Sequence, residues 1–216
     1  LDLNNDAQFT LAELEAITEL TLWTRVKSDF YTFSTDAIAD LSDLQYLTNL
    51  EYLDIQGVPA TLKSIDLSKN TKLRSLNCAN TAITAIDLSN NTELEELNLS
   101  ATKISSIDLS KNTKLKKLHI GGCTQLKNLD VSMLTELTML NCAYANITEL
   151  NVANNTQLVA LYCSGNQLTE LNVSTLAALE RLICDDNKLT TLDASANSQL
   201  KVLTCTRNQL TSINVG

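Results

Sequence analysis

Apolar residues recur along this chain with a period of 21 residues. An early register begins at Leu50, and a partial one begins at Ile17. Self-similarity with a fixed period of this length is the signature of a solenoid. The pattern therefore predicts about nine stacked coils, the last of them incomplete. Nearly every apolar side chain aligns when the later registers begin at Leu73, Leu94, Leu115, Leu137, Leu158, Leu179 and Leu200.

Within one coil the apolar positions fall into two short stretches, as residues 94–114 illustrate. The first stretch reads L-x-x-L-x-L, and its last part alternates between apolar and polar residues, as a half-buried strand does. The second, I-x-x-I-D-L, brings the chain back along the other side. A single coil cannot bury its own apolar side, so neighbouring coils must stack in parallel. At roughly 4.8 Å per strand, nine coils make a solenoid about 43 Å long with a parallel sheet on one face.

The repeated stretch resembles the leucine-rich repeat, L-x-x-L-x-L-x-x-N-x-L. The 21-residue form with cysteine at the sixth position is similar to the internalin-J-like and Bacteroides-type repeats of bacterial secreted and surface proteins, and the resemblance covers residues 17–216. It implies an α/β fold: a leucine-rich repeat solenoid with a curved parallel sheet on the concave face and extended or 3-10 return segments on the convex face. We expect a loop and a short helical cap over residues 1–16, followed by the repeat domain over residues 17–216.

Cysteines form a ladder in this pattern. Other coils place Ile55, Leu99 and Ile120 at the same sixth position, so cysteine replaces an inward-facing aliphatic side chain. Parallel stacking points the Cβ vectors of successive cysteines in one direction, which strains a disulfide. A stacked row also fails to surround a metal ion tetrahedrally. We expect free, buried thiols at Cys78, Cys142, Cys163, Cys184 and Cys205.

Two further ladders consist of short polar residues. At the asparagine position of the repeat, Ala145 has no side-chain group for hydrogen bonding, so we expect a looser turn there. On the return side, carboxylates and amides share one position, where they cap local backbone groups. The asparagine position holds Thr81, Thr102, Cys123, Ala145, Asn166, Asn187 and Asn208, and the return-side position holds Asp66, Asp87, Asp108, Asp130, Asn151, Asn172, Asp193 and Asn214.

Residues 2–13, DLNNDAQFTLAE, fit the calcium loop of an EF-hand, D-x-[DN]-x-[DN]-G-x5-E, except that Ala7 replaces glycine. Side-chain and backbone oxygens at these spacings project toward one ion as the loop wraps. The alternative is that Thr10 and Glu13 form a capping box for a short helix, and the two readings are compatible. We expect no required cofactor, and possible Ca²⁺ binding through Asp2, Asn4, Asp6, Gln8, Thr10 and Glu13.

Composition narrows the function classes. The chain has 25 acidic and 16 basic residues, a net charge of −9, and no cluster of Lys and Arg that would form a phosphate-binding footprint. Its apolar runs are too short to cross a membrane. No nucleophile elbow, phosphate loop or H-E-x-x-H motif occurs, and we expect the lone His119 on the exposed sheet face. These features favour a protein that is not an enzyme and that binds neither nucleic acid nor the membrane interior.

A partner is expected on the concave face, where the polar positions of the strand stretch project from the sheet. Most of these positions carry polar residues, which need no explanation. The later coils also place apolar and aromatic side chains there with arginine beside them, the usual composition of an interface centre. Scattered exposed hydrophobic residues are the alternative. The predicted partner-binding residues are Met139, Tyr144, Tyr162, Arg181, Ile183 and Asp185.

The resemblance implies a bacterial secreted or cell-surface protein that recognises or adheres to a partner, such as a host surface protein, through the concave face. Two alternatives remain open. The repeats could be a structural spacer in a larger surface assembly, or the chain could be an intracellular binder resembling ribonuclease-inhibitor-type repeats. Fold alone does not choose among them, because function depends on the site that a fold carries.

Overall fold

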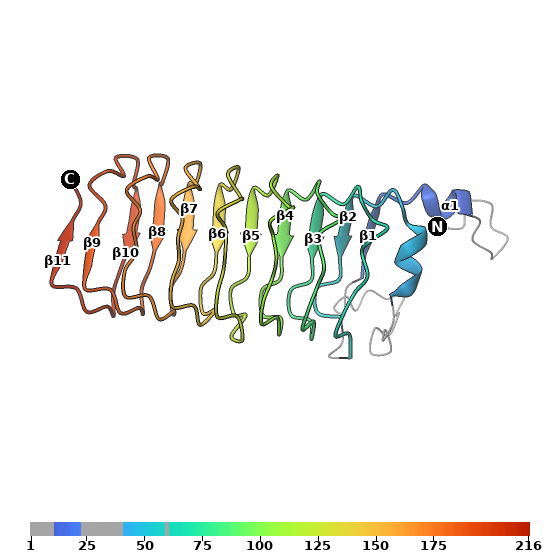
Figure 1. The fold of residues 1–216 in the computed structure, drawn as a ribbon, viewed down its shortest axis with the longest axis horizontal. Coiled ribbons are helices and arrows are strands. Elements are labelled where there is room, and N and C mark those ends of the chain that lie inside the picture. Colours follow the sequence, from blue (N-terminus) through green and yellow to red (C-terminus); the bar gives the residue numbers. More distant parts are fainter. Residues whose placement is uncertain (1–10, 23–40, 59–60) are drawn as a thin grey trace, which may run out of the picture.

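The predicted solenoid is confirmed. A computed structural model describes residues 11–22, 41–58 and 61–216, and in this part of the chain consecutive strands stack along the long axis of the molecule (Figure 1). All nine strands of the main sheet are parallel, and their order is β1-β2-β3-β4-β5-β6-β7-β8-β10. The strands are β1 Glu19–Thr21, β2 Tyr52–Asp54, β3 Ser75–Asn77, β4 Glu96–Asn98, β5 Lys117–His119, β6 Met139–Asn141, β7 Ala160–Tyr162, β8 Arg181–Ile183 and β10 Val202–Thr204.

The register of the sheet follows the repeat in the sequence. The central leucine of each strand pairs with the central leucine of the next, as Leu97 does with Leu118. These leucines are buried from β2 to β8. Burying a leucine side chain stabilises the fold by roughly 1.5–3 kcal/mol. The register that places leucine opposite leucine is therefore favoured, because it buries all of them.

Helices are confined to the N-terminal end of the described chain. Helix α1, Leu11–Glu15, and the 3-10 helix η2, Ser42–Tyr46, pack together before the second coil. The side chain of Asn49 joins them by donating to the carbonyl oxygen of Glu15 at 2.8 Å. The expected cap helix is therefore present.

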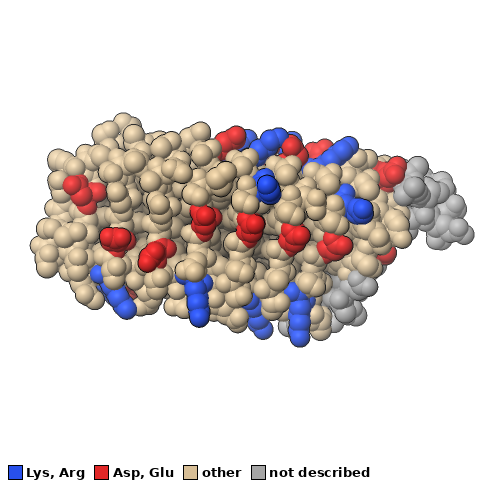
Figure 2. Space-filling view, viewed as in Figure 1, with Lys and Arg blue, Asp and Glu red and all other residues tan. Residues whose placement is uncertain are grey.

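The return segments are mostly extended chain joined by turns. This agrees with the expected extended segments. Two of them form a short parallel pair, β9 Thr191–Asp193 with β11 Ser212–Asn214. Capping by the shared Asp and Asn position is confirmed: Asp87 Oδ1, for example, accepts from the backbone N–H of Ser89 at 2.9 Å. This hydrogen bond lowers the pKa of the Asp87 carboxyl, while neighbouring Asp108 and Asp66 oppose the shift. Acidic side chains follow one another along the solenoid in Figure 2.

Turns after the strands are held by the predicted asparagines. Asn166 Nδ2 donates to the carbonyl oxygens of Cys142 and Cys163 at 2.9 Å each. Its Oδ1 accepts from the backbone N–H groups of Ala145 and Ile147 at 3.1 and 3.2 Å. The turn at Ala145 therefore keeps its hydrogen bonds, although the Ala145 side chain supplies none, because the asparagine of the following coil reaches back to the Ala145 backbone. The expected looser turn is not found. In an earlier coil, Cys123 occupies the asparagine position, and its Sγ donates to the carbonyl oxygen of Leu99 at 3.1 Å.

A second asparagine ladder, which we did not predict, closes the turns before the strands. Each member donates Nδ2 to two carbonyl oxygens of the preceding coil; Asn112 bonds to those of Leu88 and Asn91 at 3.1 and 2.9 Å. All of these side chains are buried. The ladder consists of Asn70, Asn91, Asn112, Asn155 and Asn197.

The cysteine ladder faces inward, as expected. Cys78, Cys142, Cys163 and Cys184 are fully buried, whereas Cys205 in the last coil is half-buried, and all are free thiols. Burial raises the pKa of the Cys142 and Cys184 thiols to about 12. A thiol that stays protonated at neutral pH is a poor nucleophile and metal ligand, so these side chains fill the core.

Candidate functional site

Five positions in each coil project from the sheet face: the second, third, fifth, seventh and eighth, counted from the leucine that begins the register. In the coils of β6 and β7 these positions carry no charge. The uncharged strip is defined here as these ten residues and comprises Thr138, Met139, Asn141, Ala143, Tyr144, Val159, Ala160, Tyr162, Ser164 and Gly165.

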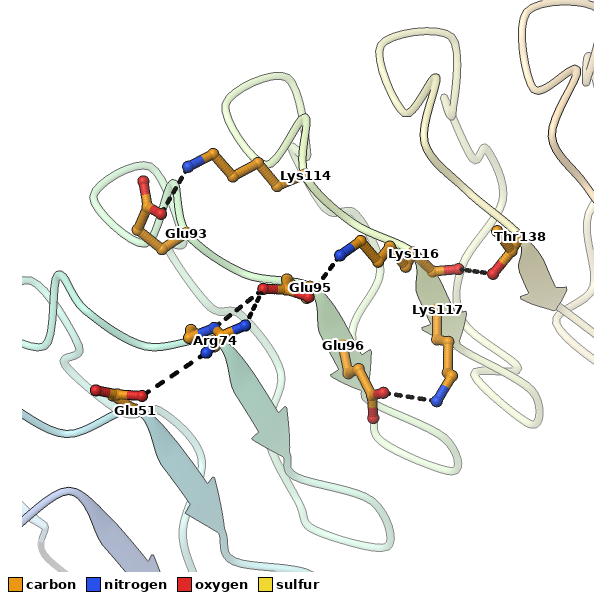
Figure 3. Close-up of polar contacts among 9 residues, drawn as sticks. All are labelled: Glu51, Arg74, Glu93, Glu95, Glu96, Lys114, Lys116, Lys117 and Thr138. Atoms are coloured by element: carbon orange, nitrogen blue, oxygen red, sulfur yellow. Dashed lines mark hydrogen bonds and ion pairs between the residues drawn. The ribbon is translucent and has the colours of Figure 1, made fainter.

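On the N-terminal side of the strip, charged residues of adjacent coils form ion pairs. Glu95 lies between Arg74 and Lys116, with N–O distances of 2.5 and 2.7 Å (Figure 3). Lys117 pairs with Glu96 at 2.6 Å. Hydrogen bonds from Lys116 and Arg74 lower the pKa of the Glu95 carboxyl to about 2. This row of ion pairs ends at Lys116, since the next coil places Thr138 in the same register (Figure 3).

Charged side chains on the C-terminal side of the strip also form ion pairs and hydrogen bonds within the molecule. Glu180 pairs with Lys201 at 2.9 Å, and Arg207 Nη2 donates to Asp186 Oδ2 at 2.6 Å. The carboxylate of Asp185 accepts from the hydroxyls of Thr204 and Thr206 at 2.7 Å each. Asp185, which we predicted as a partner-binding residue, therefore joins two coils of its own chain.

A shallow hollow of about 280 Å³ lies between the strip and the last two coils. Tyr144, Tyr162 and Ile183 supply its apolar surface. Tyr162 and Ile183 are direct neighbours, since β7 and β8 pair with Leu161 opposite Leu182. The complete lining is Asn141, Ala143, Tyr144, Tyr162, Ser164, Ile183, Asp185, Asp186 and Arg207.

Tyr144 places an aromatic side chain at a turn position where the backbone is left-handed. Its backbone φ is 56°, in the left-handed region, and 58% of its surface is exposed. The left-handed turn belongs to the repeat, and it costs a residue with a side chain roughly 1–2 kcal/mol. The other coils fill this position with Gly57, Asn80, Ala101, Gly122, Gly165, Asp186 and Arg207. The aromatic ring lies over Gly165, where an added Cβ would come within 2.2 Å of the ring atom Cδ1. Glycine in the next coil thus makes room for the exposed ring.

The structure brings together four of the six predicted partner-binding residues. Tyr144, Tyr162, Ile183 and Asp185 line the hollow, whereas Met139 and Arg181 lie one row away, on either side of Ala160 in the sheet. Sequence reasoning missed Gly165, although its position in the repeat places it beside Tyr144. It also missed the salt bridge between Asp186 and Arg207, which a charge at the same position of successive coils could have indicated.

His119 lies on β5 between Asn98 and Asn141 of the neighbouring strands. It is half-buried, and this burial lowers the pKa of its imidazole. Within the described ranges, no three His, Cys, Asp or Glu side chains are grouped to hold a metal ion. Nor does any described helix have the length and apolar content needed to cross a membrane.

Most of the predicted calcium loop lies outside the described residues: Asp2, Asn4, Asp6, Gln8 and Thr10. Glu13, the expected bidentate ligand, is part of α1 and is buried, with 8% of its surface exposed.

A family model described as leucine-rich repeats (2 copies) matches residues 71–111. A comparison with curated proteins found no match. Among solved structures, the functional domain of InlJ from Listeria monocytogenes, which includes a cysteine ladder, is similar over 93% of this chain and 46% of its own, with 28% identity and a TM-score of 0.68. A leucine-rich repeat protein of Leptospira interrogans is similar over 79% of this chain and 46% of its own, with 26% identity and a TM-score of 0.74.

Internalin C2 of Listeria monocytogenes shares the fold at 21% identity, with a TM-score of 0.57 over 92% of this chain and 84% of its own. Together these matches establish that the fold is a leucine-rich repeat solenoid of the internalin-like kind. Such solenoids present an extended surface suited to protein–protein interaction. The chain spans less than half the length of the InlJ functional domain and of the Leptospira chain in these structures.

Proposed function

We propose that this chain is a protein-recognition module that binds its partner on the sheet face, with the hollow around Tyr144 as the centre of the interface. The observation that carries the proposal is Tyr144 itself, an exposed ring in a left-handed turn with its position reserved by Gly165. The left-handed turn recurs in the other coils, and Tyr144 differs from their residues in placing an exposed aromatic ring there. A tyrosine in this setting is rigid, partly apolar and accessible, which suits an interface anchor.

The uncharged strip supports the same assignment. In the coils on both sides of the strip, Lys116, Lys117, Glu180 and Asp186 are held in ion pairs, so desolvating these groups would be costly. The ten residues of the strip carry no charge, so covering the strip itself desolvates no charged side chain. Asp185, Asp186 and Arg207 line the far side of the hollow, where each forms a hydrogen bond with a residue of the adjacent coil. Its apolar members include Val159, which is 38% exposed, and Tyr144.

The setting we propose is a secreted or cell-surface bacterial protein whose partner is a protein on a host surface, by analogy with the internalin-like fold. A binding module rather than an enzyme accounts best for the described residues, because five of their six thiols are buried and their one histidine lies between Asn98 and Asn141. Surface exposure is tested separately, by fractionating cells that express the full reading frame and probing intact cells for this domain.

The binding proposal is tested by a quantitative pull-down from host-cell surface extract with wild type, Tyr144→Ala and Tyr162→Ala. Tyr46→Ala is the matched control, because Tyr46 is 45% exposed but lies on η2, outside the hollow. We expect a protein that wild type and the control retain, and that Tyr144→Ala retains at least tenfold less, as for an interface hot spot worth about 2 kcal/mol. Equal retention by all variants would place binding elsewhere. No retention by wild type would favour a structural spacer.

A further inference from the structure

Arg181 differs from the other charged residues that border the uncharged strip. Lys116, Lys117, Glu180 and Asp186 all have an ion-pair partner in an adjacent coil. Arg181 is exposed, and among the described residues no carboxylate lies within ion-pair distance of its guanidinium. The structure explains this: its neighbours in the sheet are Ala160 on β7 and Val202 on β10, so neither adjacent strand offers a charge.

The position of Arg181 relates it to the hollow. Arg181 and Ile183 are the first and last residues of β8 and project from the same face of the sheet. Two residues of a strand span about 6.6 Å, twice the rise per residue. Arg181 is therefore about 6.6 Å along the strand from Ile183, which supplies part of the apolar surface of the hollow. Its guanidinium can bind a carboxylate through two parallel hydrogen bonds.

We propose that the partner presents an extended segment with a large apolar or aromatic side chain for the hollow and an Asp or Glu two positions away for Arg181. Two side chains on the same face of an extended segment are two residues apart, as Ile183 and Arg181 are on β8. The distance between them is the same in both chains, because both have the rise per residue of a strand. This inference rests on the proposed function and specifies the chemistry of the partner. It makes Arg181 a specificity determinant, since no carboxylate of the described residues neutralises its charge.

Selection from a displayed library of random 12-residue peptides tests this inference on the full chain. Peptides are selected on wild type and on Arg181→Glu, and the affinity of each enriched peptide is measured by fluorescence polarisation. Binding is compared among wild type, Arg181→Gln, Arg181→Lys, Tyr144→Ala and Lys127→Gln. Lys127 is the matched control, because it is an exposed cation on the return side, away from β8.

We expect wild type to enrich peptides with an acidic residue two positions from an aromatic or large aliphatic one. Arg181→Glu should select Lys or Arg at that acidic position. Arg181→Gln should bind a wild-type peptide about tenfold to a hundredfold more weakly, in line with hydrogen bonds to charged groups. Arg181→Lys should recover part of this loss, since it restores the charge but not the bidentate geometry, and Lys127→Gln should bind as wild type does.

Two other outcomes are distinguishable. Peptides that require Tyr144 but show no acidic preference, and that bind Arg181→Gln and wild type equally, would overturn the role of Arg181 and leave the hollow as the binding site. Peptides that bind independently of Tyr144 and Tyr162 would overturn the proposed function as well. A panel of neutral oligosaccharides is the counter-screen: saturable binding that Tyr144→Ala abolishes would identify a carbohydrate ligand and overturn the inference of a carboxylate-bearing segment.

Discussion

Single residues decide which coils of this regular molecule are suited to binding. Tyr144 occupies a turn position where neighbouring coils carry small or polar residues, and Gly165 leaves room for its ring. Asp185 shows the opposite case: a residue that looks available in the sequence is engaged with Thr204 and Thr206 of the next coil. The identity of a residue in a repeat therefore indicates a role only together with its neighbours one coil away.

Calcium binding by the N-terminal loop is a prediction at this scale. Its oxygen donors run from Asp2 to Glu13, and the last of them lies within α1, so a bound ion would join the loop to the cap helix. We expect Ca²⁺ at a hundredfold excess over its dissociation constant to stabilise the chain by about 2.7 kcal/mol. The measurement is the urea-unfolding midpoint in CaCl2 and in EGTA, with Asp2→Asn/Asp6→Asn as the control. Equal midpoints for wild type in the two buffers would contradict the prediction.

At the scale of elements, polar ladders hold the turns between coils while leucines hold the strands. The asparagines after the strands were recognisable as part of the repeat consensus. The second ladder was not, because Asn91 and Asn112 stand in polar segments such as S-K-N-T-K, where asparagine is expected at the surface. Only the structure shows that these side chains turn inward and bond to carbonyl oxygens of the preceding coil.

Removing one member of this ladder is expected to be costly. Asn112→Ala leaves the carbonyl oxygens of Leu88 and Asn91 without their side-chain donor in a buried turn. Both carbonyl oxygens keep a backbone donor, from the N–H groups of Asn91 and Leu94. The loss is therefore that of two hydrogen bonds at about 0.5–1.5 kcal/mol each, and we expect the free energy of unfolding to fall by about 1–3 kcal/mol. Urea denaturation measures this loss. Thr113→Ala, at the exposed neighbouring position, should change stability little, and a similar loss in both variants would contradict the explanation.

For the molecule as a whole, stacking makes stability depend on neighbours rather than on a central core. Internal strands are covered on both sides by adjacent coils, whereas β10 pairs only with β8 and forms the edge of the sheet. Accordingly, Leu140 on β6 is fully buried and Leu203 on β10 is only partly buried. Equivalent residues of the repeat thus contribute unequally according to their place along the solenoid.

A pair of leucine variants tests this dependence. Leu140→Ala opens a cavity between two coils and is expected to cost about 3–5 kcal/mol. Leu203→Ala removes a side chain that water already reaches, so we expect a loss of about 1 kcal/mol, close to the transfer term alone. Urea unfolding monitored by circular dichroism compares the two. Equal losses would mean that the last coil is as well packed as the internal ones.

The sequence by itself determined the solenoid, the strand register and the inward cysteine ladder, because each follows from a short periodic rule that every coil repeats. It also indicated the apolar residues of the hollow, since Tyr144, Tyr162 and Ile183 stand at positions that are mostly polar in the repeat. The tertiary structure decided what depends on contacts between coils: the engagement of Asp185, the second asparagine ladder, the place of the Tyr144 ring over Gly165, and the lack of an ion-pair partner for Arg181. The physical reason is that the repeat fixes where each side chain starts, whereas its role depends on which groups of the adjacent coils its end can reach.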